Sequence, residues 1–306
     1  MQIKERIQTA ERRDELVALC KKIYGCLPDK PTHLSLDVTS EDRTFAAGKG
    51  TLSEMNVYFD FEGRTEIIPI KSVSPSTDGK YPAIVFLGSD LSIPNKFLPA
   101  EEIVDRGYGL FVLSAENIKD SEIKRSSVLP TEPLGTNKRP IPPTPLMLTA
   151  WVAMRVVDFL MKQDCINKEK IVVMGHGMLG EAALLTAALD QRIEYVIAND
   201  SLSLGLMNDS GDVIRTLPDL FTDEYIKSDV DTDPHEILLS LCSDRHILIG
   251  CCEDDVRSNP EKELKYLASL IKSGMPKENI SYHSRSGSHY LSRDDWRVYL
   301  DYVDSI

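Results

Sequence analysis

The sequence predicts an α/β fold built on a mostly parallel, doubly wound sheet with an N-terminal antiparallel hairpin. Strand-like runs at 55–61 and 65–73 are separated by a Glu-Gly-Arg turn, which is typical of a β-hairpin. From residue 83 onward, short apolar runs alternate with segments of helical periodicity. This alternation is typical of βαβ units, whose parallel strands are covered by helices on both faces.

The expected elements follow one another without a clean domain boundary, so we predict a single domain over residues 1–306. The first 25 residues have the pattern of an exposed amphipathic helix, within an N-terminal extension that reaches residue 50. After the hairpin, strands are expected at 83–88, 109–114, 170–174, 195–198, 246–251 and 280–283. Helices are expected at 98–106, 146–162, 179–189, 261–273 and 294–303. Two segments, 117–145 and 201–234, are predicted to be insertions or long loops.

Composition and charge exclude several classes of function. The formal net charge of −13 argues against a nucleic-acid partner or an anionic membrane, because both need clustered Lys and Arg. No apolar run is long enough for a transmembrane helix, and no secretory h-region opens the chain, so a cytoplasmic location is expected. The six cysteines and six histidines lack metal-ligand spacing, so neither a metal nor a cofactor is predicted. No sequence feature specifies an oligomeric state.

The most informative local motif is Gly-His-Gly-Met-Leu-Gly at 175–180. It lies between a β-run and an alanine-rich helix, which is the strand–turn–helix context of a G-x-S-x-G nucleophile elbow. Gly177 stands where the nucleophilic serine is expected, and the final glycine comes one residue late. The letters also match the dinucleotide-binding pattern G-x-G-x-x-G. That pattern normally lies in the first βα unit of a fold, whereas this motif lies past the middle of the chain.

The surrounding residues resemble a known family of α/β-hydrolases, which includes glucuronoyl esterases and acetyl-xylan-esterase-like proteins. Members carry a tryptophan-containing helix, an elbow similar to GHSRLGK, a D-x-R helix end and a strand ending in N-x-S. The corresponding residues here are Trp151, the motif at 175–180, 190–192 and 199–201. Further similar blocks lie at 233–239, 253–260, 287–291 and 295–296. The resemblance implies an α/β-hydrolase fold.

The resemblance also implies roles for individual residues. His289 matches the general base of the family, in the chain order nucleophile, acid, histidine. Asp255 is our choice for the acid that orients the imidazole, and Asp254 is the alternative. Gly177 then marks a nucleophile position that has no oxygen to attack an ester carbonyl.

Other departures from the family accompany Gly177. Met178 replaces an arginine next to the oxyanion position, and Glu181 replaces a lysine one helical turn further on. The second oxyanion donor is expected in the loop after residue 88. There, Ser89 and Asp90 depart from the family segment, and a carboxylate is a poor neighbour for developing negative charge. Several local departures favour natural divergence over a single engineered change.

Two functional hypotheses follow. The first is a catalytically impaired esterase relative, a pseudo-esterase, which keeps a pocket for a small carbohydrate-derived or acyl ligand or for a partner protein. The alternative is an active carboxylic ester hydrolase. In that case His289 and Asp255 would activate a water directly, or another serine would supply the hydroxyl. The serines considered are Ser89, Ser114 and Ser201.

Overall fold

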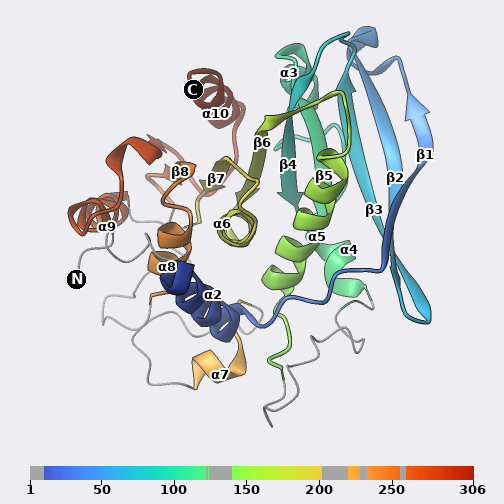
Figure 1. Cartoon of the computed structure of the whole chain (residues 1–306). Helices are drawn as coiled ribbons and strands as arrows, with labels where there is room; N and C mark the ends of the chain where they lie inside the picture. Colours follow the sequence, from blue (N-terminus) through green and yellow to red (C-terminus); the bar gives the residue numbers. More distant parts are fainter. Residues whose placement is uncertain (1–9, 122, 124–139, 202–219, 228–232, 256–259) are drawn as a thin grey trace.

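The computed structural model describes residues 10–121, 123, 140–201, 220–227, 233–255 and 260–306. Within them, one nine-stranded sheet has the order β1-β2-β3-β5-β4-β6-β7-β8-β9 (Figure 1). The strands are β1 (His33–Asp42), β2 (Gly50–Phe61), β3 (Arg64–Pro75), β4 (Tyr81–Gly88), β5 (Gly109–Ser114), β6 (Ile166–His176), β7 (Tyr195–Asn199), β8 (His246–Cys252) and β9 (Ile280–Arg285). The predicted fold class is confirmed.

The N-terminal part of the sheet is antiparallel. β2 and β3 form the predicted hairpin, and β3 joins the rest of the sheet by antiparallel pairing with β5. β1 pairs with β2 at the edge of the sheet and was not predicted from the sequence. β1 carries mostly polar side chains and is largely exposed, so it lacks the apolar pattern from which a buried strand is recognised.

The remaining strand pairs are parallel, from β5 across β4, β6, β7 and β8 to β9. β4, β5 and β7 are buried along nearly their whole length, which explains their continuous apolar sequences. In an open parallel sheet, ligands bind beyond the carboxyl ends of the strands. The loops that follow β4, β6, β7, β8 and β9 therefore define where a functional site is expected.

Helices cover both faces of the sheet (Figure 1). One core cluster contains residues of α2 (Ala10–Tyr24), α5 (Pro145–Leu160), α6 (Met178–Leu189), α8 (Pro234–Leu241) and α9 (Pro260–Lys272). The other contains residues of α3 (Ala100–Asp105) and α10 (Arg293–Asp304). The central strands contribute alternate side chains to the two clusters, as a doubly wound sheet requires.

Shorter helices lie within the two segments predicted as loops. α4 (Ala115–Asp120) begins where β5 ends, and α7 (Asp223–Ile226) lies in the second segment. The predictions for 124–139, 202–219 and 228–232, and for the first nine residues, fall outside the described residues. Over the portion of the chain that is described, no helix is both long enough and apolar enough to cross a lipid bilayer.

Candidate active site

The turn from β6 into α6 has the backbone geometry that a nucleophile elbow requires. Gly177 has φ +60° and ψ −129°, a conformation that residues with a side chain adopt only under strain. A Cβ added at Gly177 would lie 3.3 Å from Nε2 of His289 and 3.5 Å from its Cε1. At Gly175 a Cβ would lie 2.0 Å from the Leu179 carbonyl oxygen, so only glycine allows this close strand–helix approach.

His289 and Asp255 form the hydrogen-bonded pair expected of a base and its orienting acid. Nδ1 of His289 lies 2.6 Å from Oδ2 of Asp255, whose side chain is buried. This contact fixes the orientation of the His289 ring, with Nδ1 toward Asp255 and Nε2 toward Gly177. Within the chain as described, the arrangement therefore has a base and an acid but no hydroxyl at the elbow.

Asp254, the alternative acid, has a different position. It is exposed, and its carboxylate accepts the Gly287 N–H at 3.0 Å, while its own N–H donates to the Gly287 carbonyl. Gly287 has φ +114°, which favours glycine in this turn. Asp254 thus anchors the loop that carries His289, and Asp255 is the residue that contacts the imidazole.

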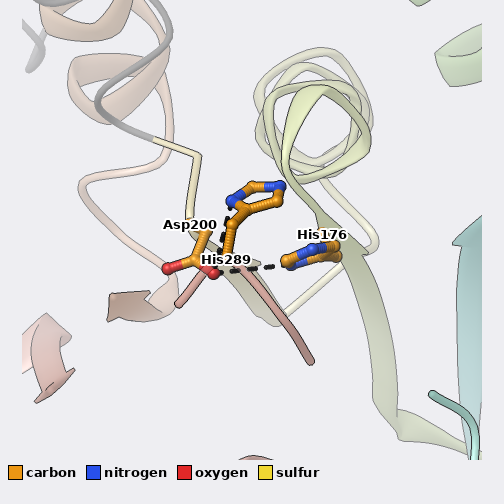
Figure 2. A group of neighbouring side chains, drawn as sticks. All are labelled: His176, Asp200 and His289. Carbon is orange, nitrogen blue, oxygen red and sulfur yellow. Dashed lines mark ion pairs between the residues drawn. The ribbon is translucent and has the colours of Figure 1, made fainter. Parts of the chain in front are cut away.

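The structure adds a carboxylate that the sequence analysis did not assign. Asp200 follows β7 and is buried, and its Oδ2 lies 3.6 Å from Nδ1 of His289 (Figure 2). Burial raises the pKa of this carboxyl. A hydrogen bond from the Cys252 thiol, at 3.1 Å, lowers the pKa and offsets part of that rise. Asp200 also has φ +48°, a left-handed conformation that aspartate and asparagine adopt more readily than most residues with a side chain.

A signal for Asp200 was present in the sequence. β6 and β7 pair in parallel with His176 opposite Asn199. The residue after each strand therefore leaves the sheet at the same level, which places Asp200 beside Gly177. Asp200 comes directly after the strand next to the elbow, and residues at the carboxyl ends of neighbouring parallel strands commonly line the same site.

His176, which had no predicted role, also faces this site. Its ring centroid lies 4.3 Å from that of His289, with 35° between the ring planes. Its Nδ1 lies 3.1 Å from the Asn199 amide oxygen and 3.8 Å from Oδ2 of Asp200. Figure 2 shows both imidazoles on the same side of the Asp200 carboxylate, with a nitrogen of each directed at one of its oxygens.

A pocket of about 450 Å³ opens in front of the two histidines. Its walls combine apolar side chains with a few polar groups, the composition usual for small-molecule sites. The lining residues are Phe86, Leu87, Gly88, Ser89, Asp90, Ser92, Asn95, Lys96, Phe97, Leu98, His176, Leu179, His289 and Leu291. Ser89 and Asp90 thus border the pocket, and the Asp90 carboxylate accepts the Ser92 N–H at 2.7 Å.

The serines considered as replacement nucleophiles are placed differently from an elbow serine. The Ser114 hydroxyl donates to the Ser89 carbonyl at 2.9 Å and accepts the Asn117 N–H at 3.1 Å, as the N-cap of α4. Ser201 is buried against Gly180. A Cβ added at Gly180 would lie 2.7 Å from the Cβ of Ser201. Across the described residues, no hydrogen bond joins Ser89, Ser114 or Ser201 to an imidazole.

Two residues predicted to border the oxyanion position lie elsewhere. Met178 is 48% exposed at the start of α6 and does not line the pocket. Glu181 is buried on the other side of α6, where its carboxylate lies 2.5 Å from Nε2 of His235 and accepts the Tyr24 hydroxyl. Although burial lowers the pKa of His235, the Glu181 carboxylate raises it to about 9. The Glu181 prediction is corrected because the helix turns this side chain into the core.

The order of the sheet, the turn after β6, the acid after β8 and the histidine after β9 define an α/β-hydrolase fold. A family model for fungal glucuronyl esterases matches residues 143–252, which include Gly177 and Asp200 but end before Asp255. A carbohydrate esterase from an unknown prokaryotic organism is 25% identical over 179 residues, covering 48% of this chain and 41% of that protein. The chain thus spans less than half the length of this curated relative.

Solved structures agree with these matches. A glucuronoyl esterase from Solibacter usitatus has a TM-score of 0.77 and 21% identity, covering 97% of this chain and 92% of its own. A promiscuous esterase from a marine bacterial metagenome has a TM-score of 0.75 and 20% identity. The match covers 96% of this chain and 91% of the esterase chain. At these identities the structures establish the fold. Together with the family model over residues 143–252, they confirm the resemblance to glucuronoyl esterases that the sequence motifs indicate.

Proposed function

We propose that the protein binds a carbohydrate-derived ester or acid beside His289 and does not cleave esters through an acyl-enzyme. The supporting observation is the His289–Asp255 pair, whose free ring nitrogen faces a glycine. An acyl-enzyme needs an attacking oxygen on the protein, and removing the serine of a catalytic triad costs about 10⁶ in kcat. The carboxylate of Asp90 at the pocket reduces electrostatic support for an oxyanion.

The pocket supports retention of a binding role. Its volume of about 450 Å³ falls within the usual range for small-molecule sites. Phe97 and Leu179 offer accessible apolar surface for the faces of a sugar ring, while Asn95 and Lys96 offer hydrogen-bond donors. A similar structure, with a TM-score of 0.63, is a serine-to-alanine variant of the Sporotrichum thermophile glucuronoyl esterase in complex with methyl 4-O-methyl-β-D-glucopyranuronate. We therefore choose this uronate ester as the test ligand.

Two measurements test the proposal on the unmodified protein. A fluorophosphonate probe should leave it unlabelled, and p-nitrophenyl acetate should be hydrolysed no faster than by a His289→Ala variant. In ligand-observed NMR, methyl 4-O-methyl-β-D-glucopyranuronate should bind, and a Phe97→Arg variant at an exposed position of the pocket should weaken that binding. An Ile67→Arg variant at an exposed position on β3 is the matched control. Covalent labelling would refute the loss of nucleophilic catalysis, and absence of binding would refute the ligand-binding role.

A second candidate is a slow hydrolase in which His289 activates a water directly. The space above Gly177 favours it, because, among the described residues other than its chain neighbours, an added Cβ would meet only His289 within 4 Å. Nε2 could then hold a water where a serine hydroxyl is missing. Turnover that falls to the solvent rate in both His289→Ala and Asp255→Asn variants would support this candidate. Residual catalysis of this kind is at most about 10³–10⁴ over water.

A further inference from the structure

We propose that His176, Asp200 and His289 form a binding site for a divalent transition-metal cation of the Zn²⁺ type. One ligand atom of each residue lies within 4.8 Å of the others. Both Nδ1 atoms face the same oxygen, Oδ2 of Asp200, at 3.8 Å and 3.6 Å (Figure 2). Ligand atoms bound to one tetrahedral Zn²⁺ lie about 3.3 Å apart, so the two nitrogen–oxygen distances need to shorten by a few tenths of an ångström. The nitrogen–nitrogen distance, which is at most 4.8 Å, would shorten as the rings reorient.

The donor set suits such a cation. Two imidazole nitrogens and one carboxylate oxygen leave coordination positions open, as in catalytic zinc and non-haem iron sites. The three residues follow or end different strands, namely β6, β7 and β9. Their separation in the chain explains why no metal-ligand spacing is visible in the sequence.

Asp200 provides an independent observation that points to a ligand. Its side chain has no solvent exposure, and its Oδ1 has no hydrogen-bond partner within the described residues. A buried carboxylate normally has a cation or several donors around it. Among the described residues, its side-chain hydrogen-bond donor is the weakly polar Cys252 thiol, and Arg285 acts on it only through its charge. A bound cation would contact the carboxylate directly.

Binding requires two local changes. A metal lies in the plane of each imidazole that binds it, so the tilted rings of His176 and His289, whose centroids are 4.3 Å apart, must reorient until both nitrogens point at one position. Nδ1 of His289 is also bonded to Asp255, so the cation would take the place of the proton between them. The Asp255 oxygen, 2.6 Å from that nitrogen, would then lie beside the metal. A cation and the base function of His289 therefore compete for the same nitrogen.

The test is direct titration of the full chain with ZnCl₂ after removal of metal with EDTA, followed by calorimetry. We expect one site per chain and a rise in melting temperature of about 5 °C at a free Zn²⁺ concentration 100 times Kd. Asp200→Asn and His176→Gln should each weaken binding by at least about tenfold. Asparagine tolerates the positive φ at position 200, so this variant is expected to fold. His33→Gln, at an exposed histidine of β1, is the matched control and should bind like the wild type.

Absorption of the Co²⁺-loaded protein identifies the ligand atoms. Nitrogen and oxygen ligands produce weak visible bands only, whereas intense near-ultraviolet bands would show a cysteine thiolate and overturn the assignment. Absence of binding, or equal binding by wild type and both ligand variants, would also refute the site. None of these readouts uses an ester, so they are independent of the proposed function.

Discussion

Restoring a serine at Gly177 tests both the strain and the chemistry of the elbow. The backbone at φ +60° and ψ −129° costs about 1–3 kcal/mol for a residue with a side chain. The new Cβ would lie 3.3 Å from Nε2 of His289, which is tight enough to displace the imidazole by a few tenths of an ångström. The serine hydroxyl, one bond further, would come within hydrogen-bond reach of that nitrogen. We therefore expect Gly177→Ser to be less stable than the wild type by about 1–3 kcal/mol.

Activity should change in the opposite direction. A complete triad is worth about 10⁶ in kcat, and a weakened oxyanion site forfeits about 10²–10³ of it. We expect p-nitrophenyl acetate hydrolysis by Gly177→Ser to exceed that of the wild type by about 10³–10⁴. Urea denaturation measures the stability change, and fluorophosphonate labelling reports the nucleophile. Gly177→Ala is the matched control, because it has the same Cβ and strain but no hydroxyl.

Three results would refute this reasoning. Equal stability of wild type and Gly177→Ala would show that the elbow is not strained. Equal esterase activity of Gly177→Ser and Gly177→Ala would show that His289 does not activate a hydroxyl at this position. Activity that persists when His289→Ala is added to Gly177→Ser would show that another base acts.

The remaining predictions concern the acid and the buried ion pair. In the Gly177→Ser background, Asp255→Asn should lower kcat by about 10⁴-fold, as for other triad acids. Asp254→Asn should change mainly thermal stability. Equal losses in kcat for the two variants would contradict the assignment of Asp255 as the acid. Glu181→Gln should lower the free energy of unfolding by about 3–5 kcal/mol, because it leaves His235 buried without its partner. The folded pKa of His235 is raised to about 9 from 6.5, so the contribution of the pair is complete below pH 6.5 and is lost as the pH rises through 9. Urea denaturation at pH 6.5 and 9 should therefore show a larger fall in stability for the wild type than for Glu181→Gln.

Much of the fold was predictable because buried strands and amphipathic helices leave strong periodic patterns. β5 was predicted with its observed bounds, and α6 and α10 to within one residue at each end. β1 was missed for the opposite reason. It is an edge strand held by backbone hydrogen bonds to β2, and its polar side chains carry no burial signal.

The candidate site was predictable only in part. The motif order identified Gly177, His289 and a pair of adjacent aspartates, since those signals are local to the chain. Which aspartate meets the imidazole depends on how the chain turns after β8, and the structure selects Asp255. Glu181 was misplaced because its side-chain direction depends on the rotation of α6 against α2 and α8.

By itself, the sequence determined the α/β architecture and the absence of a hydroxyl at the elbow, because periodicity and residue identity are properties of the chain alone. Only the tertiary structure decided that Asp200 and His176 join His289 at one edge of the sheet (Figure 2). These residues are separated by long stretches of sequence, and they meet because the parallel register of β6 and β7 brings their carboxyl ends to the same level. Distances between strand ends are set by that register, which no local sequence pattern encodes.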